Sequence, residues 1–120
     1  MLDKLRSAVA GTPSHLGMYI GGQWREEASV PTVEVENPAH GDVVATVPAG
    51  SAGHAEAALE AAKRAQPAWA AIPAPERGRL VSLLADAVRD HRDLLAHVVV
   101  AEQGKPLNQA YGEIGATETF

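Results

Sequence analysis

The segment EQGKPLNQAYGEIG at residues 102–115 decides how the chain is organised. Apolar residues at helical spacing lead up to Gly104, and glycine is the residue that most readily takes the left-handed conformation at a helix C-terminus. Pro106 then suits the start of a helix, because its fixed φ and missing N–H fit a first turn. The segment therefore predicts that one helix, beginning near Asp93, ends at Gly104 and that another begins at Pro106.

Two further helices are predicted upstream of this break. Ser51 is a suitable N-cap, and apolar residues follow it at spacings of three and four, at Ala55, Ala58, Leu59, Ala62 and Ala65. We expect this helix to end near Pro67. Prolines at 73 and 75 mark a linker, and Pro75 fits the first position of an amphipathic helix with an apolar stripe of Leu80, Leu83, Leu84, Ala87 and Val88.

The residues before Ser51 have the pattern of strands. The runs at 18–20 and 23–25 flank two glycines and predict a tight hairpin. Apolar and polar residues alternate at 32–36, and turn residues separate them from an apolar run at 43–47, which predicts a second hairpin. The predicted chain is therefore α/β, with residues 1–17 as an N-terminal tail and short hairpins followed by four helices within 18–120.

Composition excludes several classes of function. The formal net charge of −5 at pH 7 argues against nucleic-acid binding, because a nucleic-acid interface needs clustered Lys and Arg. The 120 residues contain no cysteine, so they offer no disulfide, thiolate zinc site or cysteine nucleophile. The opening residues lack an apolar run long enough for a signal peptide or a membrane span, and we expect a cytoplasmic protein with no membrane partner.

No group of side chains has a catalytic or metal-binding pattern. None of the histidines, at positions 15, 40, 54, 91 and 97, has the spacing of metal ligands. Glu34 and Glu36 share one face of a strand and could act as paired carboxylates, but the polar face of a half-buried strand is the simpler explanation. Lys105 could bind a substrate anion, although the helix dipole alone favours a lysine at a helix C-terminus.

The glycines and serines also lack the settings that chemistry requires. Gly21-Gly22 and Gly104-Lys105 do not have the glycine spacing of a phosphate loop. No nucleophile elbow surrounds Ser51 or Ser82, the two serines that could be paired with His91. From its residues alone the chain is predicted to be a non-catalytic segment without cofactor-binding residues.

Several segments nevertheless occur in the order and approximate spacing of a known family. They are YIGGQW at 19–24, NP at 37–38, GDVVA at 41–45, ER at 76–77, HRDLL at 91–95 and EQGKP at 102–106. Together they resemble the N-terminal segment of the NAD(P)-dependent aldehyde dehydrogenase superfamily. The EQGKP motif followed by AYGEI at 110–114 is most similar to members that act on succinate semialdehyde, lactaldehyde and similar small polar aldehydes.

The resemblance implies an oxidoreductase that converts aldehydes to carboxylic acids with NAD or NADP, through a cysteine thiohemiacetal, in a homodimer or homotetramer. In that family the cysteine, the water-activating glutamate and the nicotinamide-binding strands lie further along. Residues 18–120 would then be an incomplete portion of the cofactor-binding domain, whose hairpins and helices pack on a Rossmann-like body absent from this chain. We expect the 120 residues alone to be inactive, to bind no cofactor tightly and to be marginally stable.

The resemblance also implies one ion site. Some members hold a monovalent cation between main-chain carbonyls just before Asn-Pro and a carboxylate on the helix after Gly-Lys-Pro. The matching positions here are Val35, Glu36 and Glu113. Carbonyl and carboxylate oxygens suit a hard cation, whereas an acidic residue on a helix is more often simply solvated.

A second class of function stays open, namely a truncated, non-catalytic scaffold or small binding domain. The two classes differ in what should follow Phe120. An enzyme requires a continuing chain that supplies a cysteine and a glutamate in the family's settings, whereas a scaffold requires neither.

Overall fold

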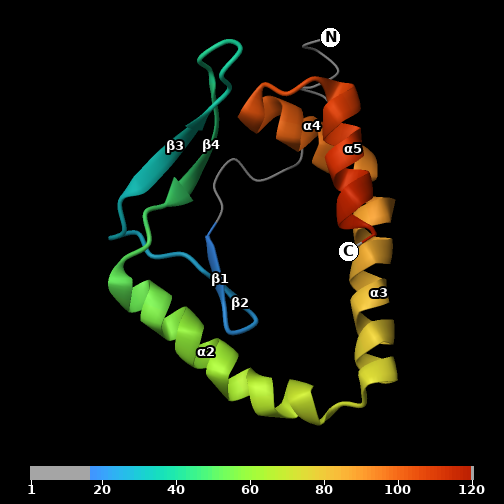
Figure 1. The fold of residues 1–120 in the computed structure, drawn as a ribbon. Helices are drawn as coiled ribbons and strands as arrows, with labels where there is room; N and C mark the ends of the chain where they lie inside the picture. Colours follow the sequence, from blue (N-terminus) through green and yellow to red (C-terminus); the bar gives the residue numbers. More distant parts are fainter. Residues whose placement is uncertain (1–16, 120) are drawn as a thin grey trace.

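The computed structural model describes residues 17–119, so the predicted tail lies, apart from Gly17, outside the described residues. Within them, two antiparallel strand pairs precede four helices, in the predicted order (Figure 1). The strands are β1 (Met18–Ile20), β2 (Gln23–Arg25), β3 (Thr32–Glu36) and β4 (Val43–Pro48). The helices are α2 (Ala52–Ala71), α3 (Ala74–Asp90), α4 (Arg92–Gln103) and α5 (Leu107–Thr117).

The first hairpin lies against α2 through small residues. Both glycines at 21–22 have positive φ, which a tight two-residue turn requires. The rings of Tyr19 and Trp24 stack edge-on across the strands, with centroids 5.2 Å apart. Ile20 is buried, and a Cβ added to the first glycine would lie 3.6 Å from the Ala61 Cβ on α2. The turn therefore lies within ordinary contact distance of the helix, and glycine is favoured at position 21 by its positive φ.

The second hairpin contains an irregularity just before its turn. Val35 pairs with Ala45 but Glu36 pairs with Val43, so β4 carries one extra residue at this point. The Asn37 N–H donates to the Asp42 carbonyl at 2.8 Å and closes the turn. The strand that was predicted to be half-buried is more exposed than expected, because only Val35 within β3 is partly covered.

Helix α2 begins as predicted but continues past the predicted end. Ser51 is its N-cap, whereas the expected end near Pro67 is wrong, because the helix includes Pro67 and runs to Ala71. A proline within a helix removes one N–H donor but keeps a helical φ. The helix ends where Ile72 takes an extended conformation directly before Pro73, and a residue that precedes proline is sterically disfavoured in a helix.

An arginine from α3 completes the C-terminus of α2. The Arg77 Nη1 donates to the carbonyl of Ile72 at 2.5 Å and to that of Ala70 at 3.3 Å. These carbonyls lie beyond the reach of any further helical N–H, and a cation stabilises this end of a helix. The next helix starts at Ala74, so Pro75 occupies its second position instead of the first.

The described core is small and lies among the last three helices. Ala96 of α4 and Ala110 and Ile114 of α5 are buried, and Val88 of α3 packs against them. Ala110 and Ile114 thus line the inner face of α5, whereas the Glu102 side chain on α4 is exposed. The predicted stripe of α3 is only partly covered, with 52% and 67% of Leu83 and Leu84 exposed.

The elements are arranged in an open shape. Helices α4 and α5 lie side by side and α5 also contacts α3, whereas α2 contacts β1 and runs to the bottom of the view, away from this core (Figure 1). The radius of gyration is 17.1 Å, compared with about 13–14 Å for a compact domain of this length. Large apolar side chains therefore remain exposed, including Tyr19, Trp24, Leu59, Leu83 and Leu84.

The break between α4 and α5 lies directly against the second hairpin. Gly104 has the predicted left-handed conformation, with φ of 65°, and its N–H donates to the Val100 carbonyl at 3.0 Å. A Cβ added to Gly104 would lie 2.8 Å from the Pro38 Cγ, closer than two carbon atoms approach in proteins. Glycine is therefore required here both by its conformation and by the contact with Pro38.

Gly104→Ala is expected to destabilise the protein by about 2 kcal/mol, since a left-handed conformation alone costs alanine about 1–2 kcal/mol. The matched control is Gly112→Ala, because Gly112 lies within α5 with no atom near its missing Cβ. This control should raise stability by up to about 1 kcal/mol. Urea unfolding of both variants measures the difference, and equal effects would contradict the role assigned to Gly104.

Candidate functional site

The second hairpin meets the α4–α5 break at Pro38 and Gly104, next in the sequence to residues proposed as an ion site. The turn after β3 is held by Asn37, whose Oδ1 accepts from the Ala39 N–H at 2.9 Å and whose carbonyl accepts from the Gly41 N–H at 2.7 Å. This turn presents Pro38 to Gly104. The backbone of residues 35–36, which immediately precedes the turn, is thereby brought toward the start of α5.

The carboxylate predicted as a cation ligand already has a positively charged partner. The Lys105 Nζ donates to the Glu113 Oε1, two turns into α5. Lys105 is mostly covered, with 21% of its side chain exposed, whereas 53% of the Glu113 side chain is exposed. Lys105 thus bonds a side chain of the following helix, in addition to lying at the C-terminus of α4 as expected.

The three predicted ion ligands are therefore not joined by a direct bond in the described structure. Val35 and Glu36 belong to β3, and Glu113 belongs to α5 and bonds Lys105. Among residues 17–119, no three side chains of His, Cys, Asp or Glu gather as a metal cluster. A site at this junction would depend on main-chain carbonyls and on Glu113, and it stays a prediction.

A second polar cluster ties α5 to the first turn of α4. The Tyr111 hydroxyl donates to the Asp93 Oδ1 at 3.0 Å, and the Arg92 guanidinium lies 5.3 Å from the centre of the Tyr111 ring. The pKa of Tyr111 is raised above its ordinary value, first because its hydroxyl bonds Asp93 and then because of burial and the Asp93 charge. The charge of Arg92 acts in the opposite direction.

The histidines and serines that were considered as chemical groups have local structural partners. The Nδ1 atoms of His91 and His97 lie 2.8 and 2.6 Å from the carbonyls of Ala87 and Asp93, one helical turn earlier. The Ser82 hydroxyl donates to a carbonyl within α3, and Ser51 caps α2. His15 lies outside the described residues.

The carboxylate pair on β3 is exposed, as a solvated strand face would be. Both Glu34 and Glu36 are exposed on this strand. The described structure therefore favours the simpler explanation of this pair, a solvated strand face.

Several contacts were not foreseen from the sequence. Three of them are the contact of Pro38 with Gly104, the hydrogen bonds from Arg77 to the end of α2, and the bond from His54 to Glu27. The first two join residues whose spacing carries no signal. For His54 there was a signal, because it follows the N-cap by three residues, where capping boxes usually have Glu or Gln.

Comparison with known proteins gives consistent matches. The family model described as the aldehyde dehydrogenase family matches residues 24–120. A malonate-semialdehyde dehydrogenase of Geobacillus kaustophilus is 42% identical over 96 residues, which are 80% of this chain and 20% of that protein. The NADP⁺-dependent succinate-semialdehyde dehydrogenase of Escherichia coli is 40% identical over 101 residues, 84% of this chain and 21% of that protein.

A solved structure agrees in three dimensions. Lactaldehyde dehydrogenase from Escherichia coli superposes with a TM-score of 0.86 at 33% identity, over 90% of this chain and 23% of that chain. The chain thus spans about a fifth of the length of the curated relatives it matches. The match to the family model begins within β2 and includes the second hairpin and the four helices.

Tyr111→Phe is expected to lower the thermal unfolding midpoint at neutral pH, because it removes the bond to Asp93. A raised pKa means that the folded protein holds the phenol proton more tightly than the unfolded chain does. The stabilisation is therefore fully present below about pH 10, the ordinary tyrosine pKa, and is lost as the pH rises through the folded value.

The difference between wild type and Tyr111→Phe should accordingly shrink in alkaline solution. Tyr19→Phe is the control, since 62% of Tyr19 is exposed and the described structure gives its hydroxyl no hydrogen bond. Unfolding midpoints between pH 7 and pH 11 provide the measurement. A pH-independent difference for Tyr111→Phe would show that the Asp93 bond is not its cause.

Proposed function

The chain belongs to the aldehyde dehydrogenase family, and we propose that the protein containing it oxidises an aldehyde to a carboxylic acid with NAD⁺ or NADP⁺. The family match over residues 24–120 is the observation that carries this proposal. In the overall reaction the aldehyde carbon loses a hydride to the nicotinamide ring and gains an oxygen atom from water. One aldehyde, one water and one oxidised cofactor yield one carboxylic acid, one reduced cofactor and one proton.

The described residues do not fit a nicotinamide cofactor by themselves. A dinucleotide site needs parallel strands joined by a helix, with a glycine-rich turn that leads to the helix N-terminus. Residues 17–119 form antiparallel pairs, and the turns that contain glycine lie in hairpins or at the end of α4. The 120 residues also lack cysteine, so the thiol of the family's reaction would come from other parts of the protein.

The role we assign to these residues is structural support of the cofactor domain. The open shape leaves apolar side chains exposed on strands and helices alike, among them Trp24 on β2, Leu59 on α2 and Leu84 on α3. Exposed apolar surface of this extent is unfavourable in water and suits burial against another body. A Rossmann-like cofactor domain, as the family resemblance implies, would provide that body.

The substrate we propose is a small polar aldehyde, with a semialdehyde as the first candidate. Two relatives that match over 80% or more of this chain are named for malonate semialdehyde and succinate semialdehyde, and the superposed structure is named for lactaldehyde. We further infer a cytoplasmic homodimer or homotetramer, as the resemblance implies. Among the helices of the described region, none has the length and apolar character needed to cross a bilayer.

The activity is tested by mixing the intact protein with malonate semialdehyde, succinate semialdehyde or lactaldehyde and with either cofactor. Formation of the reduced cofactor is followed by absorbance. We expect turnover with at least one of these aldehydes. The 120-residue chain alone should show none, because it has no thiol nucleophile. Aldehyde oxidation by the isolated 120 residues would contradict the scaffold role, and an inactive intact protein would contradict the proposed reaction.

We also propose a monovalent cation site formed by the carbonyls of Val35 and Glu36 and the carboxylate of Glu113. The support is the approach of the β3–β4 turn to the α4–α5 break and the preference of hard cations for oxygen ligands. Lys105 competes for the same carboxylate, so a bound cation would share or displace this ammonium.

Potassium or sodium should therefore raise the unfolding midpoint of the wild-type protein more than an equal concentration of a bulky organic cation. Glu113→Gln is expected to abolish this difference, and Glu102→Gln, an exposed carboxylate on α4, is the control that should retain it. Lys105→Met should enlarge it by removing the competitor. A cation response that is unchanged in Glu113→Gln would exclude the site.

A further inference from the structure

The N-terminus of α2 is capped by a histidine in an unusual position. In the usual capping box, a Glu or Gln three residues after the N-cap accepts from the N-cap N–H. Here the acceptor is the Nδ1 atom of His54, 2.9 Å from the Ser51 backbone nitrogen. The Ser51 hydroxyl lies 3.0 Å from the same ring atom and accepts from the His54 N–H at 3.4 Å. The box is complete only while Nδ1 has a free lone pair.

The second ring nitrogen of His54 faces a carboxylate from another part of the chain. Its Nε2 lies 3.3 Å from the Glu27 Oε2, in the connection between β2 and β3. Since Nδ1 accepts from Ser51, the neutral ring carries its proton on Nε2 and donates it to Glu27. Only 17% of the His54 side chain is exposed, so the ring is held between these two partners.

The ring has two polar partners in the described structure. One is the Ser51 cap, and the other, Glu27, is the charged side chain that contacts the ring. The first turn of α2 itself contributes a positive potential and contains no acidic residue to offset it. A second proton on the ring would therefore be attracted by Glu27 but opposed by the helix end.

We propose that the first turn of α2 is a proton-responsive cap, closed while His54 is neutral and opened when its Nδ1 takes up a proton. Protonation leaves two donors, the Ser51 N–H and the Nδ1–H, facing each other at 2.9 Å. The Ser51 N–H loses its acceptor, while the charged ring stays attached to Glu27.

Opening of the cap would affect the attachment of the β2–β3 connection to α2. The ring joins α2 to the segment that leaves the first hairpin, and that hairpin packs on the same helix through Ile20 and the contact with Ala61. Release of the first turn would loosen the polar attachment and leave the apolar one in place. This proposal concerns the helix cap only and does not depend on the proposed enzymatic function.

Hydrogen–deuterium exchange of the intact protein, followed by mass spectrometry of peptides that contain Ser51, provides the test. Exchange is compared at pH 7.5 and pH 5.5 after correction for the intrinsic pH dependence of amide exchange. In wild type, the protection of the first-turn amides against exchange should fall roughly five-fold at the lower pH, which is the effect expected from the loss of a typical N-cap. His54→Gln keeps an acceptor that does not titrate, and its protection should be the same at both values.

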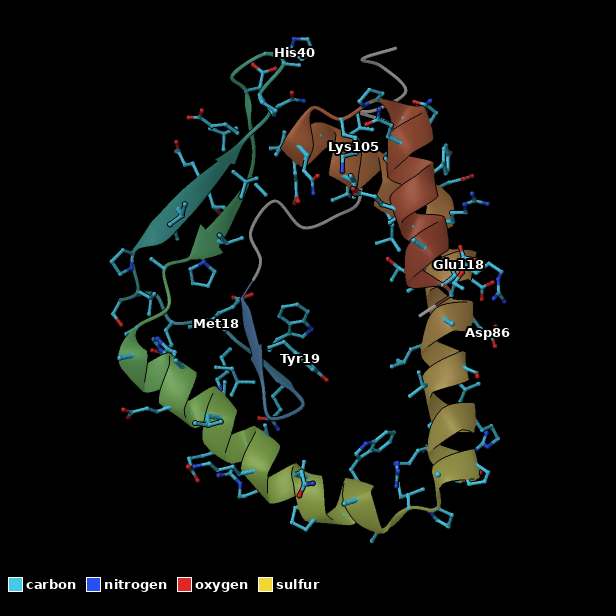
Figure 2. All side chains as sticks on the ribbon, viewed as in Figure 1. Met18, Tyr19, His40, Asp86, Lys105 and Glu118 are labelled. Carbon is cyan, nitrogen blue, oxygen red and sulfur yellow. The ribbon has the colours of Figure 1, made fainter. Side chains whose placement is uncertain are left out.

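A matched control is His40→Gln, because His40 lies on the exposed turn between β3 and β4 (Figure 2). It should respond to pH as wild type does. Equal protection of wild type at both values, or the same loss in His54→Gln, would overturn the proposal.

A second variant keeps the test decisive if His54→Gln fails to fold. Glu27→Gln removes the charge that favours the protonated ring, so the midpoint of the protection change should move to lower pH. If low pH loosened the whole protein and not this cap, the midpoint in Glu27→Gln would be the same as in wild type. An unmoved midpoint would therefore count against the cap.

Discussion

Pro38 sits so close to Gly104 that no side chain fits between them, and this contact joins the strand half of the chain to its helical half. The left-handed Gly104 ends α4 and turns the chain toward α5. Because it has no side chain, the ring of Pro38 can contact its backbone. Because α4 and α5 carry most of the buried residues, the hairpin is thereby tied to the described core. The other attachments of the strands, through Ile20 and Glu27, are made to α2, which has no buried residue of its own.

Features set by neighbours in the sequence could be predicted. Ser51 at the start of α2, the glycine turn of the first hairpin and the left-handed Gly104 each follow from local conformational preferences, and the structure confirms them. The expected end at Pro67 failed because two local rules compete. A proline within a helix is costly but tolerated, whereas the pair Ile72 and Pro73 forces an extended residue and ends the helix.

The partners of polar side chains could not be predicted in the same way. Glu113 was expected to be solvated or bound to a cation, and the structure gives it Lys105, eight residues away across the break. His54 was grouped with histidines of no special role, yet its two nitrogens link Ser51 to a carboxylate 27 residues away. Periodicity reports which face of an element is apolar and says nothing of which long polar side chain reaches which atom. The family could be identified from the sequence because its motifs are defined by residue types and their spacing along the chain, and both can be read without knowing which side chains meet in space.

The reach of Arg77 has a consequence for synthesis of the protein. Two carbonyls at the end of α2, those of Ala70 and of the C-cap residue Ile72, accept from a side chain that lies five to seven residues later in the chain. During translation these carbonyls therefore leave the ribosome without their side-chain donor. They gain it only after the first turn of α3, which contains Arg77, has been synthesised. Ribosomes add about 5–20 residues per second, so this interval lasts on the order of one second, and a chaperone could meet α2 before its end is closed.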